Sequence, residues 1–112
     1  RQESRRRIVS RVQRYIDANV GKKLTLGEVA SVFGFSQNYL STMFSRYAGC
    51  SFVEYTTAAK VNAAKRLLTE GGLRIQDIAD RLGFESAFYF SKVFKKVEGR
   101  SPREYMNRKE IP

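Results

Sequence analysis

The sequence predicts an all-α fold of seven helices, in which two similar helical units are joined by a long linker helix. Two observations support this prediction. Apolar residues recur at helical spacing along most of the chain, and no stretch shows the sustained alternation of a strand. A pattern near residue 30 also returns near residue 79, which indicates a duplicated unit. The expected helices span residues 5–19, 25–33, 37–48, 51–69, 75–82, 87–98 and 102–109.

The first expected helix is amphipathic. Four apolar side chains fall on one face, namely Ile8, Val12, Tyr15 and Ile16. Gly21 follows this face, and we expect it to end the helix.

Three later helices are expected to begin at capping boxes, in which Ser or Thr and a Glu three residues later satisfy each other's backbone amides. The pairs are Thr25 with Glu28, Ser51 with Glu54, and Ser101 with Glu104. Each cap contributes about 1 kcal/mol, so the boxes define helix boundaries more than they stabilise the fold. Other helix ends are marked by glycines, at Gly49, Gly71, Gly72 and Gly99.

The composition restricts the classes of function. Lys and Arg number 21 against 11 Asp and Glu, and the net charge of +10 favours a polyanionic partner. The chain has no His and one cysteine, Cys50, which we interpret as a small packing residue. These counts exclude an internal disulfide, a Cys/His zinc site and a His-dependent catalytic triad. We therefore expect no metal and no cofactor, and the short apolar runs predict no membrane span.

An internal repeat is the most informative feature. Val-Ala-Ser-Val-Phe-Gly-Phe at residues 29–35 returns 49 residues later as Ile-Ala-Asp-Arg-Leu-Gly-Phe at residues 78–84. Tyr-Leu-Ser-Thr-Met-Phe at residues 39–44 returns 50 residues later as Tyr-Phe-Ser-Lys-Val-Phe at residues 89–94. The second copy therefore has one extra residue in its turn, near residues 85–86.

Each copy has the features of a helix-turn-helix. Ala30 and Ala79 are small where two crossing helices must approach closely. Gly34 and Gly83 follow four residues later, where a tight turn needs a positive φ. We predict a first helix-turn-helix subdomain at residues 1–50, the linker helix at 51–69 and a second subdomain at 70–112.

These residues resemble the C-terminal DNA-binding domain of the AraC/XylS family of bacterial transcriptional regulators, over essentially the whole chain. The matching segments are residues 60–68, 78–84, 89–96 and 99–105. Three departures from the family pattern stand out. Lys60 replaces a common Arg, and Arg74 replaces a small polar cap. Ala87 and Phe88 stand where many relatives have polar side chains, which lowers the expected base reading there.

The resemblance implies sequence-specific binding of double-stranded DNA for transcription regulation, in the cytoplasm. The helices at 37–48 and 87–98 are then the recognition helices, because a major groove admits one α-helix. The linker helix is about 28 Å long, and successive major grooves on one DNA face lie about 34 Å apart. One monomer is thus expected to read two adjacent grooves, with modest DNA bending. Expected partners are operator or promoter DNA, RNA polymerase and a sensor or receiver domain preceding Arg1, since the chain does not begin with Met.

Candidate DNA contacts are the recognition-helix residues that the core leaves free. The core is expected to take Tyr39, Leu40, Met43, Phe44, Tyr47, Tyr89, Phe90 and Phe94, with Phe88 left open. The base-edge candidates are Gln37, Asn38, Ser41, Thr42, Arg46, Ser86, Ala87, Ser91 and Lys92. The phosphate candidates are Ser45, Lys60, Lys95 and Lys96. Asn and Gln pair with adenine, and Lys92 is the first choice for guanine.

Other functions stay open at this point. One alternative is a basic helical module that binds nucleic acid such as RNA, or an anionic membrane, without reading sequence. A second is a protein-interaction domain that keeps the fold and has lost DNA reading, an interpretation that Ala87 and Phe88 allow. An enzyme is disfavoured, because no nucleophile–base pair and no phosphate-binding glycine loop appears. The arginines of the first helix are interpreted as a solvated face or a linker rather than as DNA contacts: Arg5, Arg6, Arg7, Arg11 and Arg14.

Overall fold

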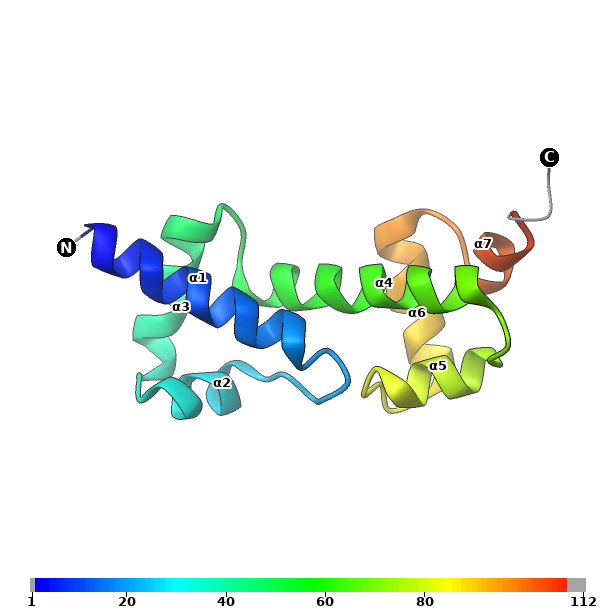
Figure 1. Cartoon of the computed structure of the whole chain (residues 1–112), viewed down its shortest axis with the longest axis horizontal. Coiled ribbons are helices and arrows are strands. Elements are labelled where there is room, and N and C mark those ends of the chain that lie inside the picture. The colour runs from blue at the N-terminus through cyan, green and yellow to red at the C-terminus, as the bar shows by residue number, and fades with distance from the viewer. Residues whose placement is uncertain (1, 109–112) are drawn as a thin grey trace. The chain divides into compact units, whose positions relative to one another are not determined.

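The structure, a computed structural model, describes residues 2–108 and forms seven helices and no strand within that range (Figure 1). The helices are α1 (Gln2–Ala18), α2 (Leu26–Phe33), α3 (Gln37–Ala48), α4 (Phe52–Glu70), α5 (Ile75–Arg81), α6 (Ala87–Glu98) and α7 (Pro102–Arg108). The all-α prediction is confirmed. Helix ends fall within one residue of expectation, except that α1 begins at Gln2 rather than residue 5. Residue 109, the expected end of the last helix, lies outside the described residues.

The chain forms two compact units. Unit 1 comprises Arg1–Asn19 and Leu24–Thr56, and unit 2 comprises Val20–Lys23 and Thr57–Pro112. The expected linker region therefore contributes to both, since α4 gives its first residues to unit 1 and the remainder to unit 2. Residues 20–23 of the connection between α1 and α2 also belong to unit 2, although both of those helices lie in unit 1.

Unit 1 is held together by a core to which each of its helices contributes. α1 and α2 both pack against α3. Phe44 of α3 meets the rings of Phe52 and Tyr55 edge-on, with centroids 5.7 and 5.6 Å apart. The Tyr55 hydroxyl donates to the Asp17 carboxylate at 3.1 Å. The fully buried side chains of this core include Val12, Ile16, Val29, Leu40 and Phe44.

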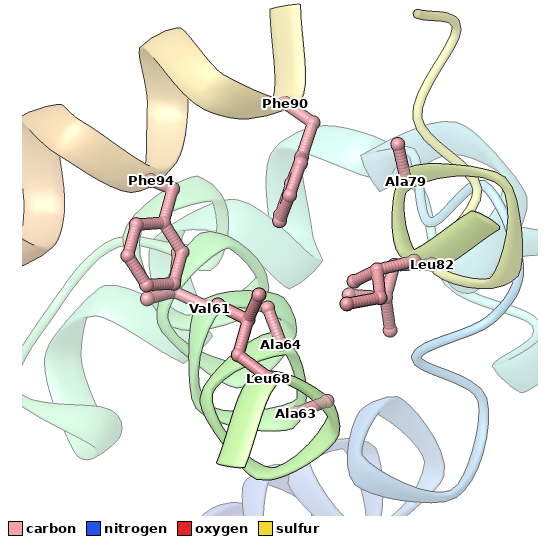
Figure 2. Packing of buried hydrophobic residues seen from close by; sticks show 9 residues of the cluster. Val61, Ala63, Ala64, Leu68, Ala79, Leu82, Phe90 and Phe94 are labelled. Atoms are coloured by element: carbon pink, nitrogen blue, oxygen red, sulfur yellow. The ribbon is translucent and has the colours of Figure 1, made fainter. Parts of the chain in front are cut away.

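Unit 2 is built on the inner face of α4 (Figure 2). Val61, Ala64 and Leu68 lie on that face and are almost completely buried. Figure 2 shows Phe90 and Phe94 of α6 directed toward this face, with centroids 5.8 Å apart. These rings and Ala63 and Ala64 of α4 belong to one buried cluster. Ala79 and Leu82 complete the same cluster from α5 and its end.

The predicted capping boxes are confirmed. Ser101 Oγ accepts from the Glu104 amide at 3.1 Å, and the Ser101 amide donates to Glu104 Oε1 at 2.8 Å. The boxes at Thr25 and Ser51 have the same reciprocal bonds.

Gly21 differs from expectation. α1 already ends at Ala18, and Gly21 is not among the glycines with a positive φ. A side chain at Gly21 would place its Cβ 2.8 Å from the Arg81 carbonyl oxygen. Close approach between two backbones, rather than helix termination, therefore explains the glycine.

Candidate nucleic-acid interface

The first helix-turn-helix joins α2 to α3. Gly34 has φ of 76°, the left-handed conformation expected for this turn. The Phe35 amide donates to the Ala30 carbonyl at 2.9 Å, which closes the turn. Ser36 then caps α3, because its hydroxyl accepts from the Tyr39 amide at 3.1 Å. The left-handed glycine, the hydrogen bond that closes the turn and the serine cap together set the direction of α3 relative to α2.

The second helix-turn-helix joins α5 to α6 and repeats this geometry. Gly83 has φ of 74°, and the Phe84 amide donates to the Ala79 carbonyl at 3.0 Å. Ser86 caps α6 by accepting from the Tyr89 amide at 3.0 Å. Glu85 is the extra residue of the second turn. Since both serines cap, Ser36 is equivalent to Ser86, and every α6 position lies 50 residues after its α3 counterpart.

One face of α3 is largely exposed. At about 100° per residue, Asn38, Ser41, Thr42 and Ser45 form one stripe along the helix. Ser41 is half-buried and the other three are exposed. Leu40 and Phe44 lie on the other side and are fully buried. The stripe carries donors and acceptors but no formal charge.

The equivalent face of α6 has different chemistry. The register places Phe88, Ser91, Lys92 and Lys95 where α3 has Asn38, Ser41, Thr42 and Ser45. Both lysines are exposed and Ser91 is half-buried. The second face is thus cationic and partly apolar, whereas the first is neutral and polar.

The remaining candidates of α3 lie beside its stripe. The side chain of Gln37 lies against Gly27 of α2, where an added Cβ would come within 3.0 Å of Gln37 Nε2. Arg46 is exposed, and its guanidinium lies 5.9 Å from the centre of the Tyr47 ring. Both side chains therefore have a contact inside unit 1.

The remaining candidates of α6 are less uniform. Ser86 uses its hydroxyl as the helix cap, and Ala87 is half-buried. Lys96 is exposed near the end of the helix. Among these three, Lys96 alone is exposed rather than half-buried.

Lys60 has a role in the structure that the sequence did not reveal. Its ammonium donates to the carbonyl oxygens of Val20, Lys22 and Leu82, each at 2.6 Å. Burial lowers the pKa of Lys60, and the three carbonyl dipoles oppose that effect by stabilising the charged form. All three N–H donors are thus used inside unit 2, which leaves none for the phosphate contact expected from the sequence.

Two tyrosines assigned to the core are exposed, so those two assignments are wrong. Tyr39 is 44% exposed and Tyr89 is 54% exposed. Each covers only the turn before its helix, Tyr39 against Phe35 at 5.2 Å between centroids and Tyr89 against Phe84 at 6.2 Å. Phe88, left open by the sequence, is 77% exposed.

The basic stretch of α1 packs on unit 1 at two points. The Arg6 guanidinium lies 5.4 Å from the centre of the Tyr47 ring, and that of Arg11 lies 5.8 Å from the centre of the Phe33 ring. The Tyr47 hydroxyl is buried without a hydrogen-bond partner.

Among residues 2–108, no cluster of His, Cys, Asp or Glu could hold a metal ion, and no helix is long and apolar enough to cross a membrane.

Residues 29–108 match the family described as a helix-turn-helix domain. The C-terminal domain of AraT, a response regulator from Geobacillus stearothermophilus, is similar in structure, with a TM-score of 0.87 and 37% identity over 90% of this chain and 84% of that one. A Chromobacterium violaceum regulator with an AraC-type DNA-binding domain has a TM-score of 0.82 at 25% identity, covering 93% of each chain.

The HTH-type transcriptional regulator YtdP of Bacillus subtilis is 37% identical over 87 residues, which are 78% of this chain and 11% of YtdP. The chain thus spans only a small part of that relative. The family match covers most of the sequence, and the duplicated helix-turn-helix geometry agrees with it. The chain therefore belongs to the AraC-type helix-turn-helix family, whose members are sequence-specific DNA-binding regulators of transcription.

Proposed function

We propose that α3 and α6 each enter a major groove of double-stranded DNA and read base edges with the equivalent faces described above. One observation carries this proposal. Two helices from two copies of the same turn present the same four register positions, and in both copies three of the four side chains are exposed and the fourth, a serine, is half-buried. A helix face kept free twice at the same positions is the arrangement that groove reading requires.

The α3 face is suited to base pairs that offer both a donor and an acceptor. The amide of Asn38 can pair bidentately with adenine, which presents N7 and N6–H₂ in the major groove. Ser41 and Thr42 carry hydroxyls that both donate and accept. Arg46 and Ser45 stand near the end of this face, at the edge where phosphates lie. Gln37 is a secondary candidate, since it already contacts α2.

The α6 face is suited to guanine and phosphate. Lys92 is exposed in the middle of the face, where its ammonium can donate to guanine O6 and N7. Lys95 and Lys96 follow in the last turn and are assigned to phosphates. Ser91 lies between Phe88 and Lys92 as an adaptable donor. Ser86 and Ala87 are expected only to flank the groove. Lys60 is not expected to contact a phosphate, because its ammonium already binds three carbonyls within unit 2.

Charge supports the same partner. A net charge of +10 favours a polyanion, and each phosphate neutralised by Lys or Arg releases counterions. This term is independent of sequence, so it adds affinity and orientation while the two faces add selectivity.

The proposal extends to the protein of which this chain is a part. AraT is described as a response regulator of which the similar domain is C-terminal. By analogy, we propose a sensor or receiver domain before residue 1, and contact with RNA polymerase once the DNA is bound. The chain itself would act by binding rather than by catalysis, in the cytoplasm, where bacterial DNA lies.

Selection from random duplex DNA tests the proposal. The 112-residue chain is incubated with a randomised duplex library at near-physiological salt, and bound DNA is recovered and sequenced over several rounds. The proposal predicts enrichment of two short motifs about one helical turn apart.

A competing function gives a different result in the same experiment. If the chain is a basic module without base reading, no motif is enriched, and binding disappears as salt rises. That outcome would overturn the assignment of base reading to α3 and α6.

A further inference from the structure

We propose that Phe88 is a specificity-determining residue that recognises the 5-methyl group of a thymine in the site read by α6. The inference rests on the proposed function and adds to it a named base. The departure of Phe88 from the family pattern suggested the opposite, namely that an apolar residue here weakens base reading. Two observations on the structure and one chemical argument support recognition.

The first observation is the exposure of the ring at a defined place. Phe88 is the second residue of α6 and is 77% exposed, whereas Phe90 and Phe94 of the same helix are fully buried. Burying a Phe ring is favourable by a few kcal/mol in most settings. The core of unit 2 does not use this ring, so its apolar surface stays available to a partner. Together with Ser91, the ring borders an open hollow of about 400 Å³.

The second observation is the register. Phe88 occupies the position that Asn38 occupies on α3, one turn before Ser91 and Lys92. The Lys92 ammonium lies 5.9 Å from the centre of the Phe88 ring, so both side chains lie on one face. If Lys92 reaches a guanine, Phe88 must reach a base edge nearby in the same groove.

The third point concerns chemistry. A phenyl ring has no donor or acceptor, and covering a polar base edge with it would remove water without replacing the hydrogen bonds. Among the major-groove edges, thymine alone offers an apolar group, the C5-methyl. A ring placed over that methyl gains apolar burial and leaves few polar atoms unpaired.

The site can be located relative to Lys92. One helical turn separates the two side chains by about 6 Å along α6, and base pairs are about 3.4 Å apart. The recognised thymine therefore lies within about two base pairs of the guanine that Lys92 contacts. The predicted α6 motif contains both bases at a fixed spacing.

Removal of single methyl groups from the DNA tests the inference. In the selected duplex, each thymine of the α6 motif is replaced in turn by deoxyuridine, which lacks only the methyl group. We expect one replacement to weaken binding of the unmodified chain about three- to fivefold, the value of one buried methyl group. The variant Phe88→Ala should bind the thymine duplex more weakly and should no longer distinguish thymine from uracil at that position.

Val97→Ala is the matched control. Val97 is an exposed apolar residue of α6, 49% exposed, and lies about 180° around the helix from Phe88. This variant should keep the full response to deoxyuridine. Circular dichroism of both variants checks that the helices are retained.

The outcomes separate this inference from the proposed function. If motifs are enriched but no deoxyuridine replacement changes affinity, Phe88 does not read thymine and the inference fails while base reading stands. If Phe88→Ala weakens binding but keeps the deoxyuridine response, the ring acts elsewhere, for example against a protein partner, and the inference also fails. If no motif is enriched, the proposed function fails, and the inference about Phe88 fails with it.

Discussion

The ammonium of Lys60 donates a 2.6 Å hydrogen bond to the carbonyl oxygen of Leu82, the C-cap residue that follows α5. The same ammonium holds the carbonyls of Val20 and Lys22, so one side chain of α4 satisfies three backbone acceptors. The segment 20–23 is thereby fastened beside the turn of the second helix-turn-helix. Lys60 stabilises unit 2 from within, whereas the sequence suggested a contact with DNA.

Lys60→Met should destabilise the chain by about 1–3 kcal/mol, because it leaves three carbonyls without their donor while keeping most of the apolar stem. Arg66→Met is the control, since Arg66 is an exposed cation of the same helix, and its cost should stay below about 0.5 kcal/mol. Urea denaturation followed by circular dichroism measures both. Equal, small effects would contradict the structural role of Lys60.

Gly34→Ala and Gly83→Ala should differ in cost although the two glycines have nearly the same φ, 76° and 74°. The left-handed conformation alone costs an alanine about 1–2 kcal/mol. At Gly34 no atom lies within 4 Å of the added Cβ, whereas at Gly83 it would lie 3.1 Å from the Gly21 carbonyl oxygen. The free energy of unfolding should therefore fall further for Gly83→Ala. Equal losses in the free energy of unfolding would contradict this prediction. They would show that segment 20–23 shifts at little cost to make room for the added Cβ.

The helix boundaries were predictable because they depend on neighbours in sequence. The Thr25–Glu28 and Ser101–Glu104 boxes and the turn at Gly34 each involve residues within five positions of one another. The free stripe of α3 was also predictable, since periodicity alone separates Thr42 from Leu40.

The remaining features depend on contacts that are distant in sequence. The carbonyls held by Lys60 lie 22 to 40 residues away, and no pattern in the sequence pairs them. The exposure of Tyr39 and Tyr89 depends on the angle between two helices, which decides whether a ring at the third helical position reaches the core. Their aromatic character favoured burial, but both rings pack on the preceding turn and stay outside the core. The register that equates Phe88 with Asn38 was present in the repeat and could have identified Phe88.

Glu104 should make stability depend on pH. The Ser101 amide, followed by the Ser101 hydroxyl, holds the pKa of Glu104 below its usual range. A carboxylate with a lowered pKa in the folded state contributes stability above its unfolded pKa of about 4.3, and that contribution is lost as pH falls through the folded pKa.

Glu104→Gln removes this titration, so the difference in Tm between the unmodified chain and the variant should shrink as pH is lowered from 7 to 3. Glu70→Gln, at an exposed carboxylate in the last turn of α4, serves as the control. Thermal unfolding by circular dichroism at several pH values measures the effect. A Tm difference that stays constant with pH would contradict the assigned role of Glu104.

Thr42→Ala and Lys92→Ala should each relax one of the two selected motifs and leave the other unchanged, because Thr42 lies on α3 and Lys92 on α6, which are proposed to enter different grooves. Loss of the Lys92 contact should weaken binding by about 1–3 kcal/mol at its own base pair. Lys96→Ala is the comparison, since loss of a phosphate contact should weaken all duplexes similarly and lower the salt slope by about one. Repeating the selection with each variant measures the effect on each motif. Relaxation of both motifs by one substitution would argue against separate reading.

Major-groove reading by both helices is tested most directly with 7-deazapurines. Each purine of the selected duplex is replaced in turn by its 7-deaza analogue, which removes the N7 acceptor that both adenine and guanine present in the major groove. In each motif, at least one replacement should weaken binding of the unmodified chain. Thr42→Ala or Asn38→Ala should abolish that sensitivity in the α3 motif, and Lys92→Ala should abolish it in the α6 motif. Sensitivity confined to one motif, or absent from both, would contradict the claim that α3 and α6 each read a major groove.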